Sequence, residues 1–256
     1  MVDDDSDDAT EQVARGLGMT YEKVAFHLVA DTRNHGLRLA KTTYVAFLDD
    51  DDLWLSGNME PQIAALQADP EVAFAFALAR CVSEDLAPLP WVFPERPPWR
   101  GKDVEALHLG YPCLGTALFR REAVESVGGF DRQVRYYEDA DLMLRLASRY
   151  PVIGLDHLAV LYRLRPPSKA RANYHWTNRH VVRWSPKEHG VGRRASAVYR
   201  FRQRRIHFYR FLEDAAACAK AAARRDWWLC VARAIWISPW HALRHPLVVA
   251  RSWWPA

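Results

Sequence analysis

Four consecutive aspartates occupy positions 49 to 52, directly after the apolar run Tyr44–Leu48. Adjacent carboxylates repel one another, and a bound cation offsets that cost. Hard divalent cations such as Mg²⁺ prefer carboxylate oxygens as ligands. The cluster therefore predicts a metal site, although a solvated acidic turn that caps the next helix would show the same residues.

A second acidic pair, Glu138 and Asp139, precedes a run with one apolar face formed by Leu142, Met143 and Leu146. This spacing predicts an amphipathic helix that begins at the acids. The helix dipole stabilises negative charge there, and an ionised carboxylate can accept a proton from a nearby hydroxyl. Ordinary helix capping is the alternative interpretation.

The elements around these acids predict an α/β sheet. Strands are expected at residues 2–4, 24–29, 44–48, 72–79 and 113–119, and helices at 9–15, 37–40, 59–69, 121–127 and 138–147. Ligands of open α/β sheets bind beyond the carboxyl ends of the strands, which is where Asp49–Asp52 falls. Five prolines between residues 84 and 101 predict a long irregular loop, expected to be a mobile flap over the site.

Composition indicates a globular protein with a full core, since the chain has 256 residues and is 50% hydrophobic. The four cysteines show no metal-ligand spacing, so we expect reduced thiols and no zinc site. The N-terminus lacks the pattern of a signal peptide, and no stretch is apolar enough to span a membrane. We therefore expect a cytoplasmic protein.

Charge is distributed unevenly along the chain. Residues 1–60 contain 13 Asp and Glu against 5 Lys and Arg, whereas residues 163–256 contain 20 Lys and Arg against 4 acids. Eight of the eleven tryptophans also lie in the basic part. A basic, Trp-rich helical segment suggests an anionic membrane surface as a partner, ahead of nucleic acid. Packing of these tryptophans on the rest of the chain is the alternative.

Five motifs in one order resemble those of the family-2 glycosyltransferases. They are Val2-Asp3-Asp4-x-Ser6, Arg33-Asn34-x-Gly36, Phe47 to Trp54, Gly128-Gly129-Phe130-Asp131, and Glu138-Asp139-x-Asp141-Leu142-x-Leu144-Arg145. The resemblance implies a GT-A fold, which is a Rossmann-like, mostly parallel sheet flanked by helices, over residues 1–166. Residues 167–256 would form a basic, mainly helical extension.

The resemblance also implies the reaction. It is the transfer, with inversion, of a sugar from a nucleotide-diphosphate sugar to an acceptor hydroxyl, with Mn²⁺ or Mg²⁺ bound. The donor is expected beside six residues, namely Asp3, Asp4, Arg33, Asn34, Asp49 and Asp50. Among these, Asp3 and Asp4 match acids that contact the nucleoside, and Arg33 with Asn34 matches the motif beside the base and diphosphate.

Metal and catalytic residues follow from the same resemblance. Asp49 and Asp51 match the metal-binding Asp-x-Asp motif, with Asp51 as the main candidate for direct contact. Asp139 matches the catalytic base, and Glu138 stands beside it. The acceptor would be a cell-surface polysaccharide, a lipid-linked glycan or a similar glycan, which suits a peripheral location on the inner face of the cytoplasmic membrane.

The chain departs from the family pattern in two ways. Relatives carry a strand and a helix before the Val-Asp-Asp motif, so we expect this sequence to lack the N-terminal part of the domain. Asp5 stands where the family usually has glycine, and an aspartate tolerates a left-handed turn better than most residues. These departures keep a second interpretation open, in which the chain is a catalytically inactive GT-A-like scaffold that binds a membrane or a partner protein.

Overall fold

The computed structural model describes residues 1–94, 99–101, 112–134 and 138–164, and seven residues between 228 and 239. The chain divides into two compact units, Met1–Leu164 and Arg165–Ala256. The division lies next to the boundary expected at residue 166. Of the predicted helical extension at 167–256, only the seven residues in 228–239 are described, and all seven are helical.

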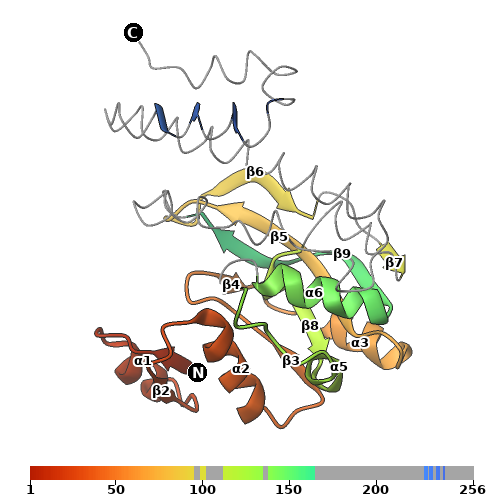
Figure 1. Cartoon of the computed structure of the whole chain (residues 1–256), viewed down its shortest axis with the longest axis horizontal. Coiled ribbons are helices and arrows are strands. Elements are labelled where there is room, and N and C mark those ends of the chain that lie inside the picture. The colour runs from red at the N-terminus through yellow and green to blue at the C-terminus, as the bar shows by residue number, and fades with distance from the viewer. Residues whose placement is uncertain are drawn as a thin grey trace. The chain divides into compact units, whose positions relative to one another are not determined.

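The first unit alternates strands and short helices along the chain (Figure 1). In order, its elements are β1 Val2–Asp4, α1 Thr10–Gly16, β2 Glu22–Val24, α2 Val29–Leu39, β3 Tyr44–Ala46, β4 Leu53–Trp54, α3 Glu60–Ala68, β5 Phe74–Val82, β6 Pro88–Phe93, β7 Trp99–Gly101, the 3₁₀ turn η1 Leu114–Thr116, β8 Ala117–Arg120, α5 Arg121–Ser126, α6 Glu138–Arg149 and β9 Val152–Arg163. The expected α/β class is therefore confirmed.

The strands form two sheets. β1 and β2 make a two-stranded parallel sheet, and the larger sheet has the order β3–β8–β5–β9–β4, with β6 paired to β5 and β7 paired to β9. The expectation of a mostly parallel sheet is wrong for the described strands, because only β1–β2 and β5–β9 pair in parallel and the other five pairings are antiparallel. One reason is the short turn after β5, which brings β6 back as an antiparallel neighbour.

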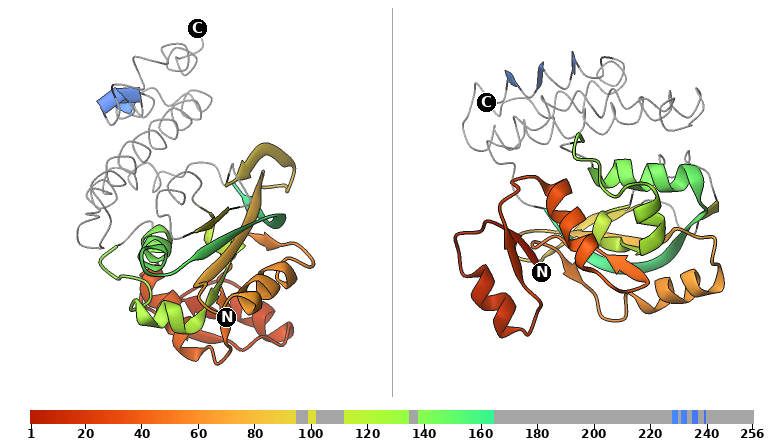
Figure 2. Two further views of the ribbon diagram at one scale, coloured as in Figure 1. Left: turned by 90° about the vertical axis from the view of Figure 1, so that its right-hand side faces the viewer. Right: turned by 60° about the horizontal axis from the view of Figure 1, so that its bottom comes forward.

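The core lies on both faces of the larger sheet. Cross-strand neighbours in register share a face, so the pair Phe74–Phe119 points to one side and Ala75–Leu118 to the other. Leu66 of α3 packs with Ala75 and Leu118 in one buried cluster. Figure 2 shows α6 on the face opposite to α3. The apolar stripe predicted for α6 is fully buried, at Leu142, Met143 and Leu146.

The connection from β2 to α2 differs from the predicted strand at 24–29. β2 ends at Val24 and α2 already begins at Val29. Between them, the carboxylate of Asp4 accepts hydrogen bonds from the backbone N–H groups of Phe26 and His27, at 2.7 and 3.0 Å. His27 takes a left-handed conformation with φ 49°. The apolar run predicted a strand, but this long-range contact turns the chain instead.

The Pro-rich stretch 84–101 also differs from the prediction, because it contains β6 and β7. β6 pairs with β5 through Ala79↔Phe93 and Val82↔Pro88 and has no second neighbour among the described strands. Proline is tolerated on such an edge because the missing N–H would face away from the ladder. The expected irregular loop is therefore partly an edge strand.

Left-handed residues shape the turns beside two of the motifs. Asp5 has φ 68° directly after β1, which is the conformation expected where relatives carry glycine. Gly128 and Gly129 have φ 83° and 71° and follow α5. The predicted stop of this helix at the glycine pair is confirmed.

Candidate active site

One guanidinium joins the two acidic motifs. Arg33, on α2, donates from Nη2 to Asp49 Oδ1 and from Nη1 to Glu138 Oε1, both at 2.6 Å. The side chain of Arg33 is only 15% exposed, and its guanidinium lies 5.6 Å from the ring centroid of Phe130. Burial alone would lower the pKa of Arg33, but the charges of Asp49 and Glu138 hold it above its ordinary value. The group is therefore a fixed positive charge between the two acids.

The next residue, Asn34, clamps the loop that carries Phe130. Its Nδ2 donates to the Phe130 carbonyl and its Oδ1 accepts the Phe130 N–H, each at 2.8 Å. A Cβ on Gly129 would lie 2.4 Å from Asn34 Oδ1, so a larger residue at this turn would displace the Asn34 amide. Asn34, predicted beside the nucleotide, has its amide engaged by this loop and thereby fixes the ring that flanks Arg33.

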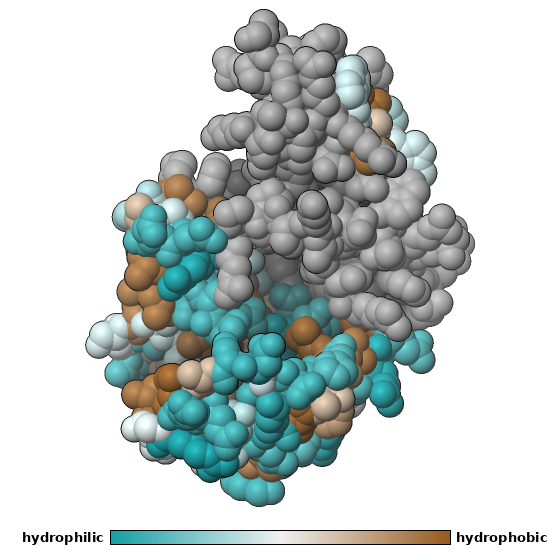
Figure 3. Space-filling view, turned by 90° about the vertical axis from the view of Figure 1, so that its left-hand side faces the viewer, coloured by the Kyte–Doolittle hydropathy of each residue, from teal (hydrophilic) through white to brown (hydrophobic). Residues whose placement is uncertain are grey.

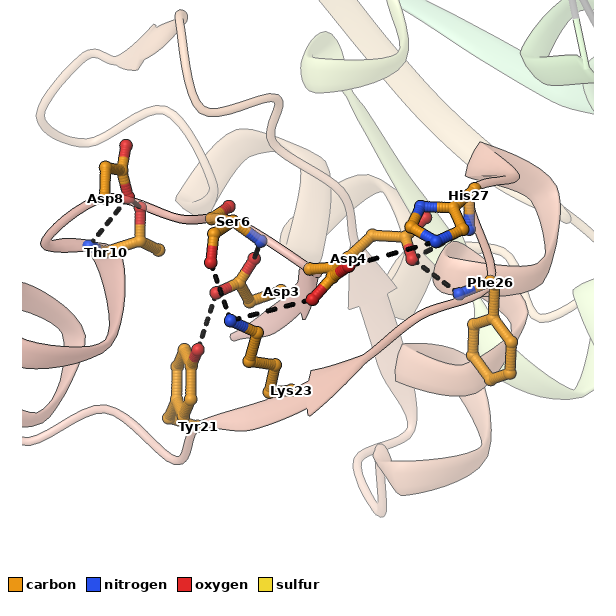
Figure 4. Close-up of polar contacts among 10 residues, drawn as sticks. Asp3, Asp4, Ser6, Asp8, Thr10, Tyr21, Lys23, Phe26 and His27 are labelled. Atoms are coloured by element: carbon orange, nitrogen blue, oxygen red, sulfur yellow. Dashed lines mark hydrogen bonds and ion pairs between the residues drawn. The ribbon is translucent and has the colours of Figure 1, made fainter.

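The acids of β1 are held by local donors (Figure 4). Asp3 is 4% exposed and accepts hydrogen bonds from the Ser6 N–H at 3.0 Å and the Tyr21 hydroxyl at 2.5 Å. Ser6 and Tyr21 thereby hold the pKa of Asp3 below its ordinary value. The same bond raises the pKa of Tyr21 to about 12. Asp3 is thus ionised and fixed in orientation.

Asp4 is linked to the centre of the site through α2. Besides the two backbone donors of the β2–α2 connection, its Oδ2 accepts the Thr32 hydroxyl at 2.8 Å. Burial raises the pKa of Asp4, but the bonds from His27, Thr32 and Phe26 outweigh it and hold the pKa below its ordinary value. Three consecutive residues of α2, Thr32, Arg33 and Asn34, thus make the hydrogen bonds that join α2 to the other four predicted motifs.

At the start of α6, Glu138 is buried and Asp139 is half-buried. Burial and the charge of Asp139 raise the pKa of Glu138 to about 7, while Arg33 opposes that rise. Asp139 Oδ1 accepts the N–H of the next residue, Ala140, at 2.8 Å, which is one of the N–H groups left without a helical partner in the first turn. Glu138 is therefore the acid that pairs with Arg33, and its neighbour Asp139 is held at the helix end.

The aspartate cluster separates into an outer and an inner part. Asp49 and Asp50 are exposed and Asp51 is half-buried, whereas Asp52 is only 6% exposed. Asp52 Oδ1 accepts the Arg163 N–H from β9 at 3.0 Å. Burial raises the pKa of Asp52 to about 7 despite this bond, with a further contribution from the charges of Asp51 and Asp49. Asp52 anchors the turn to the sheet and leaves the other three acids on its outer side.

Three residues of the site had no role assigned from the sequence. Thr32 and Phe130 contact predicted residues directly, and Asp52 anchors the acidic turn. Thr32 directly precedes the motif Arg33-Asn34-x-Gly36, and Phe130 belongs to the motif Gly128-Gly129-Phe130-Asp131. Nothing in the sequence separates Asp52 from the three aspartates before it, because it differs from them only in its burial.

Known proteins place this chain in a family. The model of glycosyl transferase family 2 matches residues 1–128. An uncharacterized glycosyltransferase of Haemophilus influenzae is 27% identical over 121 residues, covering 46% of this chain and 40% of its own. The minor teichoic acid biosynthesis protein GgaB of Bacillus subtilis is 26% identical over 199 residues. The alignment covers 72% of this chain and 22% of GgaB. The chain thus spans less than half the length of these relatives.

Solved structures of similar fold include TarS of S. aureus. TarS 1–349 has a TM-score of 0.54 at 15% identity, covering 88% of this chain and 71% of its own. The same protein in complex with UDP-GlcNAc has a TM-score of 0.53 at 17% identity, and the match covers 64% of this chain and 48% of the TarS chain. These structures support the expected GT-A fold. Because the family model covers half of the sequence, this chain belongs to glycosyl transferase family 2.

Proposed function

We propose that this glycosyltransferase moves a sugar from a nucleotide-diphosphate sugar to an acceptor hydroxyl, with inversion at the anomeric carbon. The observation that carries the proposal is Arg33, which joins the Asp49–Asp52 turn to the N-terminus of α6. Transfer with inversion is helped by a base on the face of the sugar opposite the leaving group and by stabilisation of the leaving diphosphate, which a cation can supply. The two acidic motifs that meet at Arg33 are suited to these two tasks.

The donor is a nucleotide sugar in this proposal. Structures of TarS were obtained with UDP and with UDP-GlcNAc, and TarS shares the fold of this chain. We place the nucleoside beside Asp3 and Asp4, whose carboxylates are fixed by protein donors, and the diphosphate beside Arg33, Asn34, Asp49 and Asp50. Arg33 suits a diphosphate because its planar fork of donors matches phosphate oxygens.

Asp49 and Asp51 would hold the cation. Their carboxylates are the hard oxygen ligands that Mg²⁺ and Mn²⁺ take, and Mg²⁺ is often bound by one or two carboxylates plus substrate phosphates. The described residues contain no group of three or more His, Cys, Asp or Glu that could hold a metal alone. The two carboxylates fit an ion that takes its remaining ligands from the donor phosphates and water. A cation bound there would offset negative charge on the departing diphosphate.

Asp139 is the proposed base. It lies in the first turn of α6, where its carboxylate could accept the proton of the acceptor hydroxyl as that oxygen attacks. Glu138 acts through Arg33, whose position it fixes by the 2.6 Å ion pair. The Bacillus subtilis relative is named for teichoic acid biosynthesis, which favours a cell-surface polymer or lipid-linked glycan as acceptor.

Nucleotide binding with and without Mn²⁺ tests the proposal. Calorimetric titration with UDP, GDP, CDP and dTDP should show one nucleotide that binds only when the metal is present. Asp51→Ala should weaken that binding by at least about tenfold, because it removes a metal ligand. Asp139→Asn should bind as well as the wild type yet release no nucleotide diphosphate from the matching nucleotide sugar and acceptor.

Two results would contradict the assignment. Transfer that survives Asp139→Asn would move the base to another residue. Absence of metal-dependent binding for all four nucleotides would favour the alternative, a GT-A scaffold that performs no transfer.

A further inference from the structure

The second unit presents an exposed apolar face on a helix. Its seven described residues are all helical, and six of them are exposed, while Val231 is 4% exposed. Trp228 and Trp236 expose 61% and 73% of their surface, and Leu229 and Ile235 expose 44% and 43%. The six exposed residues, here called the tryptophan face, are Trp228, Leu229, Ala232, Ile235, Trp236 and Pro239.

The spacing of the tryptophan face is that of one side of a helix. Its members stand at positions i, i+1, i+4, i+7, i+8 and i+11, which span an arc of about 120° at 3.6 residues per turn. None of the six carries a charge. The coloured residues of this unit in Figure 3 are brown and pale rather than teal. The six residues of the tryptophan face are therefore uncharged and exposed.

Two exposed indoles favour a membrane interface over water. Indole combines a large apolar ring with one N–H donor, and tryptophan is enriched at the boundary between lipid headgroups and acyl chains. Transfer of large apolar side chains out of water stabilises the bound state in proportion to the apolar area that is buried. Among the described residues, no helix has the length and hydropathy to cross a bilayer. The face therefore suits a helix that lies in the interface.

The charge of the second unit indicates which kind of membrane it would bind. Residues 163–256 contain 20 Lys and Arg against 4 acids, and Arg224, Arg225 and Arg233 stand next to the tryptophan face in the sequence. Basic residues near an anionic membrane surface are attracted to the negative charge of the lipid headgroups. A neutral bilayer would leave this positive charge without a counterpart. The charge is complementary to anionic phospholipid headgroups.

We propose that the tryptophan face of the second unit binds the interface of an anionic lipid membrane, with its indoles inserted among the headgroups. This site shares no residue with the proposed transferase centre, and its binding does not depend on the transfer reaction. The face supplies apolar insertion, and the basic residues of the same unit supply attraction to the lipid charge.

Flotation of the full chain with vesicles tests this proposal. Vesicles of phosphatidylcholine with about one quarter phosphatidylglycerol should carry the protein upward, whereas pure phosphatidylcholine should bind it at least about tenfold less. Trp228→Ser with Trp236→Ser should reduce binding to the anionic vesicles by about tenfold or more. The matched control is Val13→Ser with Leu17→Ser, which removes two apolar side chains of the first unit that are 58% and 72% exposed. That variant should bind as the wild type does.

A conservative variant keeps the test valid if the serine variant misfolds. Trp228→Phe with Trp236→Phe should still float, but vesicles with brominated acyl chains should quench its fluorescence less than that of the wild type. Equal quenching, or equal flotation of a folded serine variant, would overturn the proposal. Failure of the wild type to bind anionic vesicles would also overturn it. A third outcome is that the protein forms a dimer without lipid, that the serine variant is monomeric, and that both float equally well. This outcome would overturn the membrane proposal and assign the face to contact with a second copy of this chain.

Discussion

At the scale of single residues, Arg33 and the proposed cation would both interact with the carboxylate of Asp49. Its guanidinium is 2.6 Å from Asp49, one of the two proposed metal ligands. Arg33→Met should therefore tighten the binding of Mn²⁺ alone, since removal of the positive charge leaves Asp49 with more attraction for a cation. We expect a gain of roughly fivefold, because Asp49 is 46% exposed and solvent screens the pair. Titration calorimetry of the nucleotide-free protein measures this.

Arg132→Met is the control for that experiment. Arg132 also pairs with an aspartate, Asp31, at 3.0 Å, but its side chain is 73% exposed and its partner belongs to neither acidic motif. Its loss should leave the affinity for Mn²⁺ unchanged. Weaker or unaltered binding of Mn²⁺ to Arg33→Met would show that Asp49 takes no part in holding the ion.

Asp4 makes the stability of the protein depend on pH. Its pKa is held below the ordinary 3.8 by three hydrogen bonds, so the folded state favours the charged form. This stabilisation is fully present above 3.8 and is lost as the pH falls through the lower, folded value. Asp4→Asn should therefore lower the free energy of unfolding by about 1–2 kcal/mol near neutral pH, and the difference should shrink in acid.

Urea denaturation of Asp4→Asn at a series of pH values checks this. Asp7→Asn is the matched control, since Asp7 is an exposed acid of the same segment. It should change the free energy of unfolding by less than about 0.5 kcal/mol. A cost of Asp4→Asn that stays constant down to the acid end would show that packing, and not the carboxylate charge, holds β1 to α2.

At the scale of elements, the turn after α5 depends on two glycines with different surroundings. A Cβ on Gly128 would meet nothing within 4 Å, whereas one on Gly129 would lie 2.4 Å from Asn34 Oδ1. Gly128→Ala should cost about 1–2 kcal/mol, the strain of its positive φ. Gly129→Ala should cost about 2 kcal/mol more, because it also displaces the Asn34 amide from Phe130. Chemical denaturation of both variants measures the difference.

A double-mutant cycle separates the two contributions. In an Asn34→Ala background the steric conflict at Gly129 is absent, so Gly129→Ala should cost no more than Gly128→Ala does. If its cost stayed high in that background, the clamp between α2 and this turn would not be the cause.

At the scale of the whole first unit, the site joins segments that are far apart in the sequence. β1, α2, the Asp49–Asp52 turn and the N-terminus of α6 meet through side chains of α2. A ligand bound across them stabilises the folded state by mass action, about 2.7 kcal/mol at a hundredfold excess over Kd. A nucleotide diphosphate with Mn²⁺ should therefore raise the Tm by about 5–10 °C.

The metal requirement distinguishes this stabilisation from a nonspecific effect. Nucleotide with excess EDTA should raise the Tm little, and Asp51→Ala should lose the metal-dependent part. Scanning calorimetry gives both values. Equal shifts with and without Mn²⁺ would contradict a role of the cation in donor binding.

Several features could be predicted because they are local. The buried stripe of α6, the helix stop at Gly128-Gly129 and the α/β class follow from periodicity and backbone conformation, which depend on neighbouring residues. The family could also be predicted from the sequence, because five short motifs occur in the order typical of the family. Strand directions, the turn at residues 24–29 and the strands within 84–101 were predicted wrongly. These depend on pairing with strands or side chains that are distant in the sequence.

The sequence by itself determined which residue types could carry chemistry, namely the acids at 49–52 and 138–139 and the Arg33-Asn34 pair. It left open which of them act together, since their spacing gives no distance. Only the tertiary structure decided that Arg33 joins Asp49 to Glu138, that Asn34 clamps Phe130, and that Asp52 is buried against β9 while Asp49 and Asp50 are exposed. The physical reason is that burial, charge pairing and pKa depend on neighbours that packing brings together across the chain.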